Sequence, residues 1–278
     1  MSGIGMSLLS NSSSGLETME PSDPAASNTA PARSGGTRAA AAASFSIATY
    51  NIHSCVGLDG RREPERVAEV LHELDADVVA LQEVDSRRLK THGHWIDQFA
   101  YLAELTGYEA VPGPNVVDHS GSFGNVLLSR FPVRRTRAVD LTFSTWREPR
   151  GAIDAELALG SRRLRVVATH LGLTLRERNA QVAQLMDVLL AEGDETAPCV
   201  LLGDLNEWRP RGGSLRPLMG ELEGSPQRAT FPTWRPLLPL DRIFARNAWF
   251  EHVEAHRSAR SRIASDHLPL KAICRWTD

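Results

Sequence analysis

Residues 197–208 (APCVLLGDLNEW) constrain the fold of this chain more than any other segment. The apolar residues 199–202 predict a short strand that is buried on both faces. Gly203 allows close backbone approach, and alternation places the side chains of Asp204 and Asn206 on the same side. A carboxylate and an amide are therefore expected together at a rigid strand end, where they could hold a water and an oxyanion. Taken alone, the same residues could simply open a turn.

Hydrophobic periodicity in the rest of the chain predicts a mixture of strands and helices. Residues 209–239 are rich in Gly and Pro and are expected to be mostly loop with one short helix. The expected strands are residues 45–50, 78–81, 125–129, 153–159, 164–169, 199–202, 240–244, 249–255 and 268–276. The expected helices are residues 64–74, a segment around Phe99 that ends at Gly107, and residues 176–190.

The order of these elements bears on the fold class. Some strands are separated by helices, whereas residues 160–162 (GSR) are typical of a hairpin turn between adjacent strands. A purely parallel sheet would need a helix between nearly every pair of strands. We therefore predict an α/β fold in which two mainly antiparallel sheets pack face to face and helices cover the outside.

The first 43 residues differ in composition from the rest. They are rich in Ser, Ala, Gly, Pro and Thr, so they cannot bury enough apolar surface to offset the entropy lost on ordering. We expect a disordered low-complexity tail over residues 1–43 and one folded domain over residues 44–278. With 278 residues, 42% of them hydrophobic, the chain is long enough for a large core.

Composition also bears on location and partners. The tail lacks the features of a signal peptide, and no stretch approaches the ~20 apolar residues of a membrane-spanning helix. An odd number of cysteines, three, favours a reducing compartment, and we expect a cytoplasmic protein. The net charge of −3 is unlike the basic field of strong duplex binders.

Polar side chains repeatedly follow the predicted strands. Each could be structural by itself: a turn residue, a surface carboxylate or a core histidine. Their recurrence where an apolar strand ends is harder to explain structurally, and it predicts a shared site. The residues are Asn51, Glu83, His170, Asp204, Asn206, Asp241, Asp266 and His267.

Seven ordered motifs resemble the endonuclease/exonuclease/phosphatase superfamily, which includes deoxyribonuclease I. Together they cover residues 45–276, nearly all of the predicted domain. They are TYNIH (49–53), LQEVD (81–85), GNVLLSR (124–130), ATHL (168–171), GDLN (203–206), LDRIF (240–244) and SDHLPL (265–270). The resemblance implies a four-layered α/β sandwich, in agreement with the two-sheet prediction, and metal-dependent hydrolysis of phosphoesters.

The resemblance also implies a metal site. Glu83 matches the family's principal metal ligand, and Asn51 matches the amide beside the metal and the phosphate. Asp266 adds a carboxylate on the metal side. Carboxylate and amide oxygens suit Mg²⁺ or Mn²⁺, which we expect as the cofactor.

Five further residues match the family's catalytic positions. Asp204 matches the residue that orients or deprotonates the attacking water, and Asn206 the one that binds a non-bridging oxygen. His267 matches a histidine that contacts the scissile phosphate, with Asp241 as its carboxylate partner. His170 matches a second histidine, which is the expected proton donor to the leaving oxygen.

Substrate contacts are less clearly defined. Arg150 resembles an arginine that could hold a phosphate in a bidentate pair, and a surface arginine is an equal alternative. Asn125 resembles an amide that faces the active site, and it could equally be a strand-start residue.

We expect a phosphodiester substrate, first a nucleic acid in a nuclease-type reaction. A phosphomonoester or a phospholipid headgroup is the alternative. From a different class, the chain could be a catalytically silent binding scaffold. Peripheral membrane contact through aromatic residues such as Trp234 or Trp249 is a less favoured alternative, and no protein partner is inferred.

Overall fold

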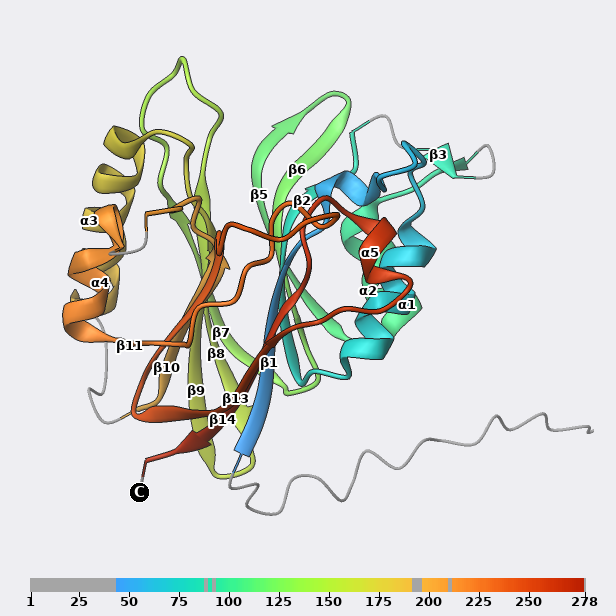
Figure 1. Ribbon diagram of the computed structural model, residues 1–278. Helices are drawn as coiled ribbons and strands as arrows, with labels where there is room; N and C mark the ends of the chain where they lie inside the picture. Colours follow the sequence, from blue (N-terminus) through green and yellow to red (C-terminus); the bar gives the residue numbers. More distant parts are fainter. Residues whose placement is uncertain (1–43, 88–89, 92–93, 192–196, 210–211, 278) are drawn as a thin grey trace, which may run out of the picture. The chain divides into compact units, whose positions relative to one another are not determined.

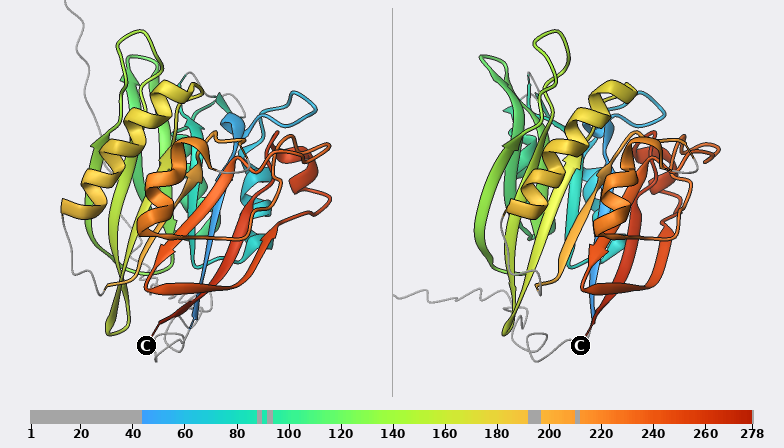
Figure 2. Two further views of the ribbon diagram at one scale, coloured as in Figure 1. Left: turned by 60° about the vertical axis from the view of Figure 1, so that its left-hand side comes forward. Right: turned by 90° about the vertical axis from the view of Figure 1, so that its left-hand side faces the viewer.

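The computed structural model describes residues 44–87, 90–91, 94–191, 197–209 and 212–277. The predicted disordered tail, residues 1–43, lies outside these residues. All described strands except β3 and β4 form two six-stranded sheets that face each other, and helices lie on the outer face of each sheet (Figure 1 and Figure 2).

In the first sheet the strand order is β13-β14-β1-β2-β6-β5. Strands β1 and β2 run parallel, and the other neighbouring pairs of this sheet are antiparallel. The bounds are β1 Ser44–Asn51, β2 Val78–Asp85, β5 Glu109–Asp118, β6 Gly121–Ser129, β13 Ala248–Ala255 and β14 Leu270–Trp276.

The second sheet repeats this arrangement, with the order β11-β12-β10-β9-β8-β7. Strands β9 and β10 are parallel, and the other neighbouring pairs are antiparallel. The bounds are β7 Val133–Asp140, β8 Gly151–Leu159, β9 Arg162–His170, β10 Cys199–Asp204, β11 Glu223–Gly224 and β12 Asp241–Arg246.

Helices bury their apolar faces against both sheets. Val67 and Leu71 of α1 and Leu102 of α2 pack on the first sheet, whereas Leu185 of α3 and Leu218 of α4 pack on the second. The bounds are α1 Pro64–Leu74, α2 Gln98–Thr106, α3 Leu175–Ala191, α4 Arg216–Glu221 and α5 Ser261–Ala264. Two 3-10 turns, η1 His53–Cys55 and η2 Gly213–Leu215, and a small ribbon of β3 Lys90–Thr91 and β4 His94–Trp95 complete the elements.

Among the described residues, no helix combines the length and apolar character needed to cross a bilayer.

The central core lies between the two sheets. Ile47 and Leu127 of the first sheet and Val166 and Leu202 of the second belong to one apolar cluster, and each is fully buried. Burying a side chain of this size contributes about 1.5–3 kcal/mol. The predicted four-layered α/β sandwich with mainly antiparallel sheets is therefore confirmed.

Two long strands, β5 and β7, are not predicted by the sequence pattern, and neither are the two-residue strands β3, β4 and β11. Both long strands form edges of their sheets. Strand β5 contains Pro112 and Pro114, and most side chains of β7 are exposed or half-buried, so neither shows a regular apolar pattern. Strand β2 also continues beyond the predicted residues 78–81 to Asp85, through a bulge before Val84.

A buried ion pair holds the chain that leaves β10 against α3. Arg178 Nη2 lies 3.5 Å from Glu207 Oε2, and the two side chains are 2% and 0% exposed. Glu207 also accepts hydrogen bonds from Ser214 N at 2.9 Å and from Arg209 N at 3.0 Å. Asp204 and Asn206 directly precede Glu207 in the chain. The ion pair therefore holds the segment that carries them in place.

We expect Glu207→Ala to lower the free energy of unfolding by about 3–5 kcal/mol, because it leaves the Arg178 charge buried without its partner. Urea denaturation measures the change. Glu221→Ala, at the exposed end of α4, is the control and should stay within about 0.5 kcal/mol of wild type. Equal effects of the two substitutions would contradict the structural role of the ion pair.

Candidate active site

The predicted site residues meet at one edge of the sandwich. Parallel strands end at the same edge of a sheet, and each sheet has one parallel pair, β1 with β2 and β9 with β10. In Figure 1 the carboxyl ends of all four strands lie at the upper side of the sandwich. The two sheets thus bring four strand ends together, which is why residues so distant in sequence share a site.

Asn51, at the end of β1, joins the two halves of the site. Its Nδ2 donates to Glu83 Oε1 at 2.9 Å within the first sheet and to Asp204 Oδ2 at 3.1 Å across the sandwich. Its backbone carbonyl accepts a hydrogen bond from Ser265 Oγ at 2.7 Å, and its Oδ1 accepts one from His53 N at 3.1 Å. The amide is therefore fixed on every side.

Glu83 lies in the bulge of β2 and has a positive φ of 57°. A left-handed conformation is unusual for a residue with a Cβ, and bulges beside functional sites often redirect a side chain. Burial raises the pKa of Glu83, the charges of Asp204 and Asp266 raise it further, and the hydrogen bond from Asn51 lowers it. The carboxylate is thus held among other negative charges, an environment that favours a bound cation.

Asp204 lies between the amide of Asn51 and two histidines. Its Oδ2 is 3.5 Å from His170 Nε2 and 3.7 Å from His267 Nε2, and its Oδ1 accepts a hydrogen bond from Asn206 N at 3.0 Å. The preceding Gly203 has a φ of 153°, and a Cβ there would collide with the carbonyl oxygen of Thr169 on β9. The close approach predicted for this glycine is therefore confirmed.

The two histidines have opposite pKa shifts. Burial lowers the pKa of His267, but the charges of Asp241 and Asp204 outweigh it and raise the pKa to about 10. The Asp241 Oδ2 atom lies 2.9 Å from His267 Nδ1. For His170, burial and the positive charge of Arg150 lower the pKa to about 3. At neutral pH, His267 is an imidazolium and His170 is neutral.

Arg150 and Asn206 flank His170. Arg150 Nη1 lies 3.3 Å from His170 Nδ1 and 2.5 Å from Glu148 Oε1, and the side chain is 8% exposed. Asn206 Nδ2 lies 3.1 Å from His170 Nε2 and donates to the carbonyl of Leu171 at 2.9 Å. Arg150 is therefore a buried cation inside the site and not a solvated surface arginine.

Thr230 and Phe231 support His267 from a loop in which sequence analysis assigns no site residue. Thr230 Oγ1 donates to Asp241 Oδ2 at 2.6 Å, and the ring centroid of Phe231 lies 4.8 Å from that of His267. Asp241 Oδ1 is buried and has no hydrogen-bond partner among the residues that the structure describes. The sequence signal for this contact is TFPTW (230–234), a threonine and aromatic residues within a Gly/Pro-rich region.

The other two predicted residues have weaker connections to the cluster. Asp266 is about one-third exposed; its Oδ1 is 4.0 Å from His53 Nδ1, and its charge acts on Glu83. Asn125 Nδ2 donates to the carbonyl of Gly151 at 3.1 Å, and its Oδ1 is buried without a partner. Asn125 is thus connected to Gly151, next to Arg150, and within the described part of the chain its side chain makes no hydrogen bond to the catalytic cluster.

The donor set fits a hard divalent cation. Within the described residues, no three His, Cys, Asp or Glu side chains form a complete metal site by themselves. Glu83, Asp266 and the amide of Asn51 would nevertheless supply oxygen ligands near the Asp204 carboxylate. Mg²⁺ usually takes one or two carboxylates and keeps several waters, so this incomplete protein shell suits it.

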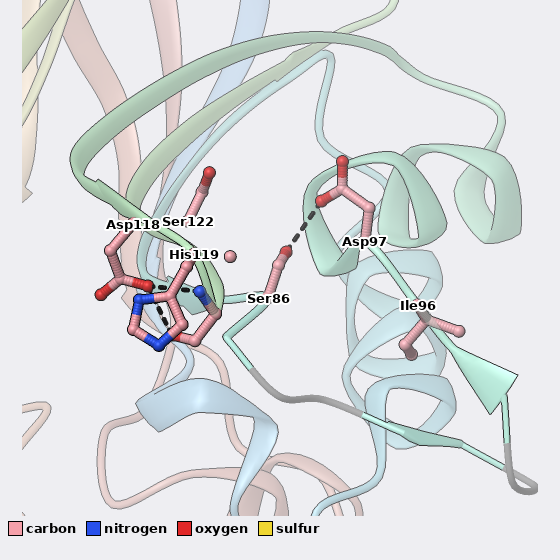
Figure 3. A pocket seen from close by; sticks show the side chains of 8 residues that line it. Ser86, Ile96, Asp97, Asp118, His119 and Ser122 are labelled. Atoms are coloured by element: carbon pink, nitrogen blue, oxygen red, sulfur yellow. Dashed lines mark hydrogen bonds between the residues drawn. The ribbon is translucent and has the colours of Figure 1, made fainter.

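An open hollow of about 660 Å³ lies beyond the carboxyl end of β2 (Figure 3). It is lined by Ser86, by Ile96 and Asp97 before α2, and by the β5–β6 turn at residues 118–122. Ser86 Oγ donates to Asp97 Oδ1 at 2.7 Å. None of the predicted catalytic side chains lines this hollow. It is therefore separate from the catalytic cluster.

The fold is that of the family that the sequence motifs resemble. The chain belongs to the Endonuclease/Exonuclease/phosphatase family, whose model matches residues 48–267. Members of this family hydrolyse phosphoester bonds.

Relatives span nearly the whole described domain. The chain is 32% identical over 247 residues to the uncharacterized protein YbhP of Escherichia coli K12, covering 82% of this chain and 95% of that protein. An endonuclease/exonuclease/phosphatase from Beutenbergia cavernae is 26% identical, with a TM-score of 0.65 over 84% of this chain and 72% of that one. The mannosyl-6-phosphatase of Bacteroides thetaiotaomicron, 16% identical, has a TM-score of 0.65 over 84% of this chain and 100% of that one, which shows a shared fold.

Asp241→Asn should lower the pKa of His267 from about 10 toward its ordinary value of about 6.5, because the substitution removes the charge beside the ring. NMR titration of the imidazole measures this pKa. A histidine whose pKa is higher in the folded state than in the unfolded state stabilises the fold fully at pH values below the unfolded-state pKa. This contribution is lost as the pH rises through the folded-state pKa. The destabilisation caused by Asp241→Asn should therefore be full below about pH 6.5 and disappear as the pH rises through about 10. A pH-independent difference would contradict this charge assignment.

Proposed function

We propose that this protein is a divalent-metal-dependent phosphodiesterase that cleaves its substrate by in-line attack of an activated water. One observation carries the proposal: the Asp204 carboxylate is hydrogen-bonded to Asn51, the partner of Glu83, and lies within 3.7 Å of two histidines. This arrangement supports a scheme in which a base, a positively charged group and a bound cation act on the same substrate group.

Glu83, Asn51 and Asp266 would hold Mg²⁺ or Mn²⁺. When bound, such an ion polarises a phosphoryl oxygen and offsets the negative charge of the transition state.

Asp204 is the proposed base. Asn206 N–H fixes its Oδ1, so that Oδ2 remains directed toward Asn51 and the histidines. In this position the carboxylate can orient a water and accept its proton as the oxygen attacks phosphorus. The side-chain amide of Asn206 is proposed to donate to a non-bridging oxygen.

His267 supplies a fixed positive charge. Asp241 keeps the ring protonated, and its Nε2 edge faces the site near Asp204. An imidazolium held in place before the reaction can stabilise the charge that develops on the phosphate oxygens.

His170 and Arg150 have complementary proposed roles. The proton-donor role expected of His170 requires a proton that its lowered pKa does not retain at neutral pH. We therefore assign to the neutral ring a hydrogen bond that orients the reacting groups, and to the Arg150 guanidinium the binding of a phosphate oxygen. Asn125, on the inter-sheet side, is proposed to contact the substrate through its unpartnered oxygen.

The substrate class stays a prediction. A nucleic acid is the first expectation from the sequence, and a phospholipid headgroup is an alternative. The fold shared with a mannosyl-6-phosphatase makes a phosphomonoester the nearest rival. The scaffold alternative is not supported, since each predicted acid, base and metal-binding residue is retained.

The test starts from chelator-treated protein that is titrated with Mg²⁺ or Mn²⁺. Substrates are plasmid DNA, bis-p-nitrophenyl phosphate and p-nitrophenyl phosphate. We expect metal-dependent cleavage of the diester, reduced about 10²- to 10⁴-fold in Asp204→Asn. Asp187→Asn, on the exposed face of α3, is the matched control. Turnover of the monoester alone would indicate a phosphatase instead of a phosphodiesterase. Full activity of Asp204→Asn would refute the proposed role of Asp204.

Thr230 is a positioning residue in this scheme, because it acts on His267 through Asp241. Thr230→Val should lower kcat/KM for the diester about tenfold, as expected for one lost hydrogen bond to a charged group. Thr230→Ser keeps the hydroxyl and should restore most of the rate. A similar loss in both variants would indicate a packing role for the threonine methyl group.

A further inference from the structure

Large apolar side chains are exposed around the catalytic cluster. Trp146 is 94% exposed, Trp234 is 72% exposed and Leu173 is 71% exposed. Folded proteins rarely leave such side chains together on the surface unless they contact a partner. We call the set at the carboxyl-end edge of the sheets the apolar rim: Leu58, Phe143, Trp146, Leu173, Leu175, Trp208, Trp234, Leu237 and Ile263.

The rim comes from loops that are held to one another and to the site. Arg147, next to Trp146, lies 3.8 Å from Glu177 at the start of α3. Asn206 donates to the carbonyl of Leu171, which places the segments of Trp208 and Leu173 side by side.

The same holds on the other side of the site. Thr233 N donates to the carbonyl of Asp266, and Leu58 N donates to the carbonyl of Ile263. Contacts therefore tie the rim segments to the catalytic cluster on both sides of the site.

Arginines lie next to the apolar residues of the rim. Arg147 follows Trp146, Arg235 follows Trp234 and Arg262 precedes Ile263, and all three are exposed. The exposed carboxylates beside the rim, Asp59 and Glu148, are paired with Arg66 and Arg150. Arg147 lies 3.8 Å from Glu177, so Arg235 and Arg262 carry most of the local positive charge. The rim therefore combines apolar side chains with positive charge, which fits a partner with apolar and anionic groups in one layer.

The kinds of apolar residue distinguish between partners. Single-stranded nucleic acids bind through bases stacked on aromatic rings, and Leu173, Leu237 and Ile263 have no ring to offer. Tryptophans at the headgroup level, aliphatic side chains below it and arginines near anionic headgroups are the combination that lipid interfaces favour.

We propose that the apolar rim docks on the surface of an anionic phospholipid bilayer, so that the active site faces the headgroup layer. The inference that a headgroup phosphodiester is then the substrate rests on the proposed function. Of the aromatic residues considered for membrane contact, Trp234 belongs to the rim. Trp249 lies opposite the site, since it pairs with Arg275 near the start of β1.

Co-sedimentation with vesicles tests the docking. We expect the full chain to bind vesicles of equimolar phosphatidylcholine and phosphatidylglycerol, to bind pure phosphatidylcholine less, and to be released by high salt. The double variant Trp146→Ala/Trp234→Ala should reduce partition about tenfold or more. Trp249→Ala, an equally drastic change at the opposite end, should stay within about twofold.

Hydrolysis of bis-p-nitrophenyl phosphate, measured in the same variants, separates docking from chemistry. The soluble diester needs no surface, so the double variant should retain its wild-type rate, which also reports correct folding. Equal vesicle binding by wild type and the double variant would overturn the proposal. So would a double variant that loses binding to oligothymidylate but keeps its binding to vesicles. An absence of metal-dependent hydrolysis in wild type would instead refute the proposed function and leave the docking result standing.

Discussion

The hydrogen bond from Asn51 to Asp204 joins the two sheets at the edge where the site lies, beyond the apolar packing between them. It forms where the parallel pair of each sheet ends, so the four strand ends face one another across the core. The other site residues are arranged around this contact: Glu83 on the Asn51 side and the histidines on the Asp204 side. The apolar core therefore determines the site, because the packing of the sheets sets the separation of these side chains.

Burial acts differently on the two halves of the site. Around Glu83 it gathers carboxylates that raise the pKa of this residue, an arrangement that a bound cation would stabilise. At the histidines burial lowers both pKa values; for His267 the charges of Asp241 and Asp204 outweigh it and raise the pKa, whereas for His170 the charge of Arg150 adds to it. Two residues of the same type thereby acquire different chemistry from their neighbours alone.

Sequence reasoning predicts most of the architecture because buried strands have clear apolar runs and the site residues follow them directly. It does not predict β5 and β7, whose edge positions leave them polar or interrupted by proline. The role of Thr230 depends on how a long loop folds back onto Asp241, and local sequence does not encode that contact. Arg150 is a similar case, since only the folded chain shows that it is buried beside His170.

Gly203 illustrates that the reacting groups lie on strand ends, whereas the residues proposed to recognise a partner lie on loops. Any side chain there would push β10 away from β9, so the spacing of Asp204 and His170 is set by backbone contact inside a sheet. The loops that carry the apolar rim begin beyond these strand ends. Substitutions in the loops can change which surface or substrate the protein binds, while the reacting groups keep their geometry. A scaffold of this kind can acquire new substrates by altering its loops and retain one mechanism throughout.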